Sequence, residues 1–164
     1  MTITIRPATE DDLPLVLEFI RDLAEYERLP HEVVADIPTL REFLFGDRPA
    51  AEIILAEEDG TTPGFALFFT SFSTFLGRPG IYLEDLFVKP EARGRGVGNA
   101  LLSHLAMLTI QRRYGRLEWS VLDWNELAIG FYRSLGAQPM SDWTVYRVTG
   151  DALAGLAART KGTE

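Results

Sequence analysis

The sequence predicts an α/β (α+β) fold in which a mixed, mainly antiparallel sheet is flanked by helices. Three observations indicate it: consecutive strand-like runs in the middle of the chain, amphipathic helical spacing before and after them, and a glycine-rich segment that leads into a helix. The chain has 164 residues, 46% of them hydrophobic, which is enough to build one core. We therefore expect a single domain spanning residues 1–164.

The N-terminal part predicts one strand and two helices. Residues 2–6 alternate between polar and apolar, and Pro7 ends this run because it offers no backbone donor. Thr9 is a good N-cap for a helix that buries one face through about Glu27. A shorter helix is expected over residues 36–45.

The middle of the chain predicts three neighbouring strands. Residues 51–58 and 65–75 form strand-like runs on either side of an Asp59-Gly60 turn, which indicates an antiparallel hairpin. A third run covers residues 81–88 and closes at Pro90. Sequential strands usually lie side by side, so these three should be adjacent in the sheet.

The remainder predicts a helical crossover followed by further elements. Glycines at 94, 96 and 98 form a turn ahead of the next helix. We expect a helix over 99–114, a strand over 116–121, a helix over 125–135 and a last strand over 143–148. The Ala-rich tail is expected to be weakly ordered.

Composition excludes several classes of function. The formal net charge of −8 opposes the positive footprint that nucleic-acid binding needs. The absence of cysteine removes thiol chemistry, and two histidines leave little for a metal site, so we expect neither. No apolar run approaches the roughly 18 residues of a membrane span, and the N-terminus does not resemble a signal peptide. The sequence therefore predicts a soluble cytoplasmic protein.

The glycine-rich turn is the first functional candidate. Its pattern is Arg93-x-x-Gly96-x-Gly98, directly before a helix, where backbone N–H groups can face a phosphate. A P-loop would need Lys-Ser/Thr after its last glycine, and the dinucleotide fingerprint would need Gly or Ala at position 99, which is Asn99. Arg93 and Arg95 can add cationic help to an anion site. The alternative is a tight connection with no ligand.

Together with a preceding strand that ends Leu86-Phe87-Val88, this turn resembles the pyrophosphate-binding motif of the GNAT acetyltransferase superfamily, which uses acetyl-CoA. Further segments resemble its spermidine/spermine and thialysine acetyltransferase branch: residues 5–9, 23–27, 82–88, 124–126 and 131–137. The resemblance implies an N-acetyltransferase that modifies a primary amine of a small cationic substrate. It also implies a homodimer with sites near the subunit interface.

The resemblance assigns residues to three roles. Glu84 would be the catalytic base, through a water, and Tyr132 the catalytic acid. Contacts to acetyl-CoA would come from Leu86, Phe87, Val88, Arg93, Gly94, Arg95, Gly96, Val97, Gly98, Asn99, Asn125 and Tyr132. The amine would contact Tyr26, Glu27, Glu84, Asp85 and Trp143.

Elementary chemistry agrees with these roles but leaves alternatives open. An alkyl amine of pKa near 10.4 has only about one molecule in 10³ deprotonated at neutral pH, so a base is needed. Glu84 and Asp85 are adjacent on a strand, which predicts opposite faces and only one of them in the same half of the site. They could equally be a solvated acidic pair. Tyr132 could be a core aromatic, and Asn125 could be the N-cap of its own helix.

The sequence also bears on the choice of substrate and on two alternative functions. Polyamine acetyltransferases of this branch carry an Asp-Pro-Trp stretch where residues 72–78 read Phe-Ser-Thr-Phe-Leu-Gly-Arg. A lysine analogue resembling thialysine is therefore favoured over a polyamine. One rival is a catalytically silent acyl-CoA-binding regulatory module. The other is a nucleotide-binding α/β domain, which the failed motif spacings disfavour.

Overall fold

The computed structural model describes residues 2–162, so the two ends of the predicted 1–164 domain, residues 1 and 163–164, lie outside the described residues. The helices are α1 (Leu13–Tyr26), α2 (Ile37–Phe45), α3 (Val97–Gln111), α4 (Glu126–Ser134) and α5 (Gly150–Ala158). The strands are β1 (Thr4–Pro7), β2 (Glu52–Glu58), β3 (Thr61–Ser73), β4 (Arg78–Val88) and β5 (Leu117–Trp119). Short 3-10 helices cover Glu10–Asp12, Pro30–Glu32, Pro90–Ala92 and Arg159–Gly162. The chain forms two compact units, Met1–Leu122 and Asp123–Glu164, and the expectation of one domain stays a prediction.

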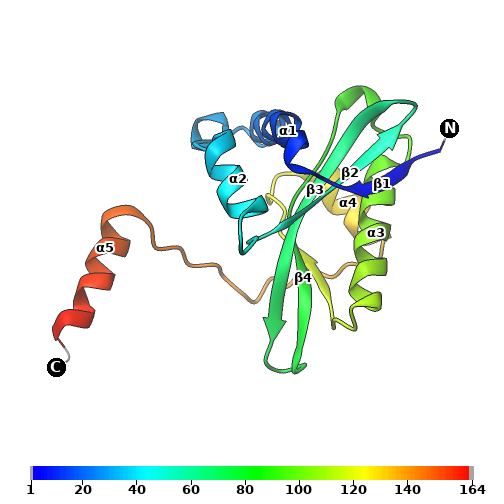
Figure 1. Ribbon diagram of the computed structural model, residues 1–164. Helices are drawn as coiled ribbons and strands as arrows, with labels where there is room; N and C mark the ends of the chain where they lie inside the picture. Colours follow the sequence, from blue (N-terminus) through cyan, green and yellow to red (C-terminus); the bar gives the residue numbers. More distant parts are fainter. Residues whose placement is uncertain (1, 163–164) are drawn as a thin grey trace. The chain divides into compact units, whose positions relative to one another are not determined.

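The first unit is built on a single sheet with strand order β1-β2-β3-β4-β5 (Figure 1). Neighbouring strands from β1 to β4 are antiparallel, while β5 runs parallel to β4 after the crossover through α3. Two of the five strands are thus joined by the predicted strand-helix-strand connection. The mixed, mainly antiparallel sheet with flanking helices is confirmed.

Local capping and turn signals act as the sequence predicts. The backbone N–H of Thr9 donates to the carboxylate of Asp12 at 2.7 Å, which is one half of a capping box ahead of α1. A hydrogen bond from Arg6 holds the pKa of Asp12 down at about 2. Asp59 and Gly60 both adopt positive φ, +50° and +77°, which is the backbone of a tight hairpin turn between β2 and β3.

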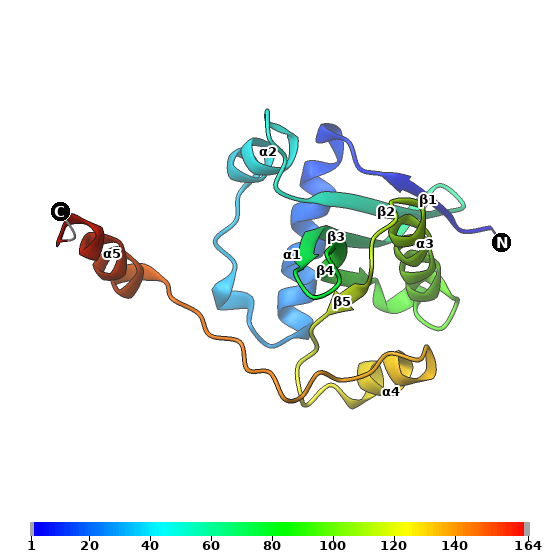
Figure 2. The ribbon, with the colours of Figure 1, turned by 90° about the horizontal axis from the view of Figure 1, so that it is seen from below.

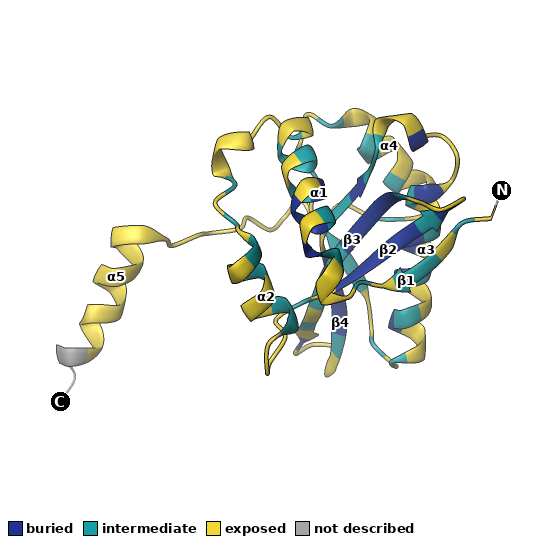
Figure 3. Cartoon of the chain, turned by 45° about the horizontal axis from the view of Figure 1, so that its top comes forward, coloured by how far each residue is buried: buried dark blue, intermediate teal, exposed yellow. Residues whose placement is uncertain are grey.

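Helix α1 covers one face of the sheet and α3 the other, and the strands pass between them in Figure 2. On the α1 face, Phe19 stacks on Phe65 of β3 with ring centroids 5.0 Å apart and meets the edge of Phe87 of β4 at 6.3 Å. On the α3 face, Gly64 allows close packing, since an added Cβ would lie 3.0 Å from the side chain of Val97. The buried residues concentrate in β2 and β3 (Figure 3).

The second unit departs from the predictions at two places. Helix α4 forms where it is expected, but residues 143–148 have no strand pairing among the described residues, so the predicted last strand is wrong. A strand needs a neighbour for its N–H and C=O groups, and residues 143–148 pair with no strand within residues 2–162. The tail is not irregular either: it forms α5, as its many Ala and Leu residues allow.

Candidate active site

A bulge in β4 arranges the acidic residues. Leu83 pairs with Phe68, but Asp85 pairs with Leu67, so Glu84 is one extra residue in β4. Phe68 and Leu67 are neighbours on opposite faces of β3, and therefore Leu83 and Asp85 lie on opposite faces of β4. The bulge interrupts the regular alternation expected for Glu84 and Asp85, and the face on which Glu84 lies stays a prediction. No local sequence signal marks this bulge.

Three carboxylates come together around this bulge. Burial, followed by the negative charges of Glu84 and Glu27, raises the pKa of Asp85 to about 7. Burial and the charge of Glu84 also raise the pKa of Glu27, which follows the last residue of α1. Asp85 and Glu27 are half-buried, whereas Glu84 is exposed. A cluster of this kind favours a cationic ligand, because a positive charge relieves the mutual repulsion.

The glycine-rich turn leads into α3 with the backbone that the sequence predicts. Gly94 and Gly96 have φ of +77° and +89°, a region that other residues rarely adopt. Gly96 is the N-cap of α3 and has no side chain to satisfy the first N–H groups of the helix, whereas Asp36 and Asn125 cap α2 and α4. These N–H groups at the positive end of a 15-residue helix fit an anionic pyrophosphate.

The neighbours of this turn belong to the strand that precedes it. A Cβ on Gly98 would lie 3.8 Å from Val88 and 4.0 Å from Leu86, which is ordinary contact. Val97 is buried and Asn99 is exposed on the first turn of α3. Leu86 and Val88 therefore lie beside the start of α3, while Phe87 points to the α1 face with Phe19.

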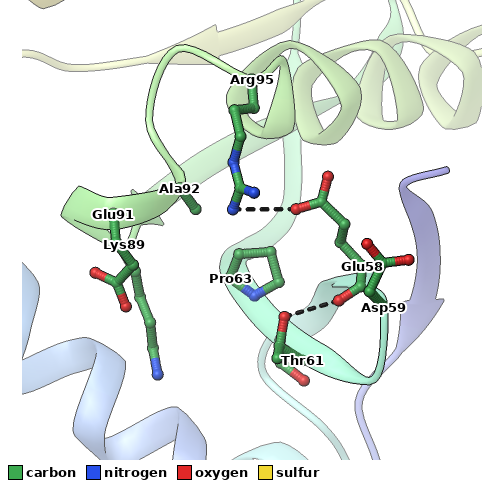
Figure 4. A pocket seen from close by; sticks show the side chains of 9 residues that line it. Glu58, Asp59, Thr61, Pro63, Lys89, Glu91, Ala92 and Arg95 are labelled. Atoms are coloured by element: carbon green, nitrogen blue, oxygen red, sulfur yellow. Dashed lines mark hydrogen bonds and ion pairs between the residues drawn. The ribbon is translucent and has the colours of Figure 1, made fainter. Parts of the chain in front are cut away.

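The two arginines of the turn contact protein groups. The Arg93 guanidinium lies 5.0 Å from the Tyr26 ring centroid, and its Nε donates to the carbonyl of Val88 at 3.0 Å. Arg95 pairs with the buried Glu58 at 3.1 Å (Figure 4). Both side chains brace the turn against other elements, and their direct help to an anion stays a prediction.

Two residues near the turn were missed by sequence reasoning. Glu58 is only 5% exposed at the end of β2, and an acid ahead of an Asp-Gly turn is indistinguishable in sequence from a solvated one. Lys89 links the end of β4 to α1, with its ammonium 3.6 Å from Glu18 and 5.5 Å from the Phe19 ring centroid. In the sequence, Lys89 stands between Val88 and Pro90 at the end of a predicted strand, and this position does not indicate which side chains it contacts.

A cavity of about 370 Å³ lies beside the turn, between the β2–β3 hairpin and the residues that follow β4 (Figure 4). Its lining includes Glu58, Lys89, Glu91 and Arg95 and carries both signs of charge. None of the three clustered carboxylates lines it. We therefore place the candidate amine site at the β4 bulge and not in this cavity.

The remaining candidates belong to the second unit. The Asn125 side chain accepts from the N–H of Ala128 at 3.3 Å, which confirms that it is the N-cap of α4. Tyr132 is half-buried on α4, with its ring 5.8 Å from that of Phe131. Trp143 is 76% exposed. Their proposed contacts to acetyl-CoA and to the amine stay predictions.

Residues 2–162 contain neither a metal-binding cluster of side chains nor a membrane-spanning helix. No group of three or more His, Cys, Asp or Glu in this range could hold a metal ion, and the expectation of metal-free chemistry stays a prediction. Among the helices of the same residues, none has the length and apolar character needed to cross a membrane.

Comparisons with known proteins agree with this geometry. Residues 17–137 match the Acetyltransferase (GNAT) family. The thialysine N-epsilon-acetyltransferase of Bos taurus is 38% identical over 168 residues, covering 96% of this chain and 98% of that protein. The L-ornithine N5-acetyltransferase of Arabidopsis thaliana is 32% identical over 197 residues, covering 93% of this chain and 86% of that protein. A solved integron cassette protein from the V. cholerae mobile metagenome matches with a TM-score of 0.79 and 30% identity, over 96% and 98% of the two chains.

The bulge of β4 and the glycine-rich turn at the start of α3 both lie within the residues that match an acetyltransferase family, which places the chain among the acyl-transferring enzymes. The chain belongs to the Acetyltransferase (GNAT) family and is an N-acetyltransferase. Members of this family use acetyl-CoA as cosubstrate.

Proposed function

We propose that this enzyme transfers the acetyl group of acetyl-CoA to a primary amine of a small cationic substrate, with a lysine analogue such as thialysine preferred over a polyamine. The grouping of Glu27, Glu84 and Asp85 at the β4 bulge is the observation that carries the proposal. Three acidic groups in one place attract an ammonium group and can also accept its proton.

Acetyl-CoA would bind at the start of α3. The residues proposed to hold it are those of the turn and its neighbours: Leu86, Phe87, Val88, Arg93, Gly94, Arg95, Gly96, Val97, Gly98, Asn99, Asn125 and Tyr132. The backbone N–H groups of the first helical turn would donate hydrogen bonds to the pyrophosphate, while the arginines keep the turn in shape through Tyr26 and Glu58.

Glu84 would remove the ammonium proton, through a water, so that the amine can attack the thioester carbonyl. Its exposure at the bulge supports access to both water and substrate. Asp85 and Glu27 would hold the cation, with Tyr26 and Trp143 as aromatic neighbours. Tyr132 would donate a proton to the leaving thiolate, an uphill transfer by only about 2 kcal/mol for a phenol near pKa 10 and a thiol near 8.5.

The preference for a lysine analogue draws support from two sources. Relatives named for thialysine and ornithine acetylation match nearly the whole chain. The turn between β3 and β4 carries no acidic residue over positions 72–78, which removes a contact for the second charge of a polyamine.

A homodimer is proposed on the basis of the second unit. Val145 and Tyr146 are 85% and 92% exposed, and the alternating segment around them lacks a strand partner among the described residues. A second copy of the chain could supply one. Light scattering at several concentrations tests this, and a concentration-independent monomer mass would refute it. The cytoplasmic location expected from the sequence also stays a prediction, which cell fractionation would test.

The decisive experiment for the activity measures CoA thiol release with a panel of amines that includes thialysine, ornithine, lysine and spermidine. We expect release with thialysine to exceed release with spermidine. Acetyl-CoA binding without thiol release for any amine would instead support the silent regulatory module.

Two variants test the proton chemistry. Glu84→Gln should retain acetyl-CoA binding but lose about 10²-fold or more in turnover at neutral pH, where free amine is scarce. Tyr132→Phe should be impaired less with a thioester whose thiol has a lower pKa, since that thiolate leaves without a proton. An equal defect with both thioesters would reduce Tyr132 to a positioning residue.

A further inference from the structure

Arg93 contacts the end of α1 through Tyr26 and the end of β4 through Phe87 and Val88. Its guanidinium carbon lies 5.0 Å from the centroid of the Tyr26 ring and 5.4 Å from that of Phe87. Its Nε donates to the carbonyl of Val88 at 3.0 Å. A planar guanidinium can stack on aromatic faces and donate in its own plane at the same time, so all three contacts are compatible.

The Arg93 contact reaches the amine site through a single residue. Tyr26 is the last residue of α1, and the next residue, Glu27, belongs to the carboxylate cluster with Glu84 and Asp85. On the other side, Arg93 is followed directly by Gly94 and, three residues on, by Gly96, the N-cap of α3. Arg93 therefore adjoins the proposed cofactor turn in sequence and contacts the residue that precedes Glu27 of the proposed amine site.

Other basic residues near the turn lead elsewhere. Lys89 contacts Glu18 and Phe19 two turns earlier on α1, and Arg95 contacts Glu58 on β2. These contacts fix the turn to the fold. Of the three basic residues of this segment, Arg93 is the one whose contact adjoins a member of the carboxylate cluster.

We propose that Arg93 is a positioning residue that couples acetyl-CoA binding to amine binding. A pyrophosphate bound at the turn would stabilise the existing contact of Arg93 with Tyr26, and this contact would keep the end of α1, with Glu27, in place for the amine. Coupling between two sites is reciprocal, so the amine must strengthen binding at the turn by the same factor. This inference rests on the proposed function, because it assumes both binding sites.

The test measures the dissociation constant of CoA by calorimetry, with and without saturating thialysine, so that no turnover occurs. We expect thialysine to tighten CoA binding about five-fold in the wild-type enzyme. Arg93→Met, which keeps an unbranched apolar stem but removes the guanidinium, should bring this ratio close to one. Tyr26→Leu should do the same, and combining the two substitutions should add little further loss.

Arg112→Met is the matched control. Arg112 also lies over an aromatic ring, 6.0 Å from the Phe68 centroid, and pairs with Glu52 at 2.8 Å, but it follows the opposite end of α3. Its loss should lower stability while the CoA–thialysine coupling ratio stays at the wild-type value.

Three results would overturn the inference: a wild-type ratio of one, an unchanged ratio in Arg93→Met with both ligands merely bound more weakly, or an equal loss of coupling in Arg112→Met. Failure of CoA or thialysine to bind the wild-type enzyme at all would count against the proposed function instead. The two failures are thus distinguishable.

Discussion

The two units of the chain differ in how far their apolar side chains are exposed. In the first unit, Val16, Phe19, Leu55 and Phe65 have no exposed surface, because α1 packs on the sheet. In the second unit, Leu127, Val145 and Tyr146 are each more than 80% exposed. Both units contain alternating apolar patterns, but only the first provides partner strands for them. An alternating pattern therefore predicts the capacity to form a strand, and the neighbouring chain decides whether it does.

The largest effect is expected for Phe65→Ala in the first unit. The ring is fully buried and stacks on Phe19 with an interplanar angle of 8°, so its removal leaves a cavity and should cost about 3–5 kcal/mol of unfolding free energy. Phe75→Ala, at a site 97% exposed, is the control and should change stability by less than about 0.5 kcal/mol. Urea denaturation measures both, and similar losses would contradict the assigned core.

Asp85→Asn should change the pH dependence of stability in the first unit. The pKa of the Asp85 carboxyl rises to about 7 on folding, so the protonated carboxyl stabilises the folded state. This contribution to the free energy of unfolding is lost as the pH increases from about 4 to 7. At pH 8 the variant should be more stable than the wild type by about 4 kcal/mol, and at pH 4 the two should be nearly equal. Asp47→Asn, at an exposed acid, is the control. A pH-independent difference for Asp85→Asn would refute the raised pKa.

Glycine substitutions compare the rigidity of the two units. Gly96→Ala should lower the free energy of unfolding by about 1 kcal/mol, because a residue with a Cβ is strained at φ of +89°. The contacts of Arg93 and Arg95 hold the turn, so it cannot relax easily. Gly150→Ala, at φ of +56° beside an exposed segment, should cost less because its flanking residues can shift. Thermal unfolding compares the two with Gly98→Ala, which meets only ordinary contacts. Equal losses of unfolding free energy for Gly96→Ala and Gly150→Ala would contradict a difference in rigidity between the two units.

The smallest effect on the fold is expected for Tyr146→Ser in the second unit. The side chain is 92% exposed, so the unfolding free energy of the monomer should change by less than about 0.5 kcal/mol. The same substitution should raise the dimer dissociation constant if a second copy covers this segment. Sedimentation at several concentrations checks this, and an unchanged dissociation constant of a dimer would show that the contact lies elsewhere.

Sequence reasoning succeeded where the determining contacts are local. The Thr9 cap, the Asp59-Gly60 turn and the Asn125 cap each depend on residues within about four positions of one another, and each forms as predicted. The glycine-rich turn also begins a helix as predicted. The match to the acetyltransferase family covers residues 17–137, which include the Asp59-Gly60 turn, the glycine-rich turn and the Asn125 cap.

Sequence reasoning failed where the structure depends on contacts between segments that are distant in the sequence. The bulge at Glu84 depends on how β4 registers with β3, and the sequence of β4 alone predicts regular alternation. The partner of Arg95 is a buried acid 37 positions away, and the absence of pairing for residues 143–148 depends on the rest of the sheet.

The sequence by itself therefore determined the order of the elements from β1 to α4, the turn chemistry and the enzyme family, because these depend on backbone geometry and short-range hydrogen bonds. Only the tertiary structure decided that Asp85 lies in a cluster with Glu27 and Glu84, and that Arg93 reaches Tyr26. Burial and charge proximity are properties of packed neighbours. The raised pKa of Asp85 exists because folding brings α1 and β4 together and excludes water between them.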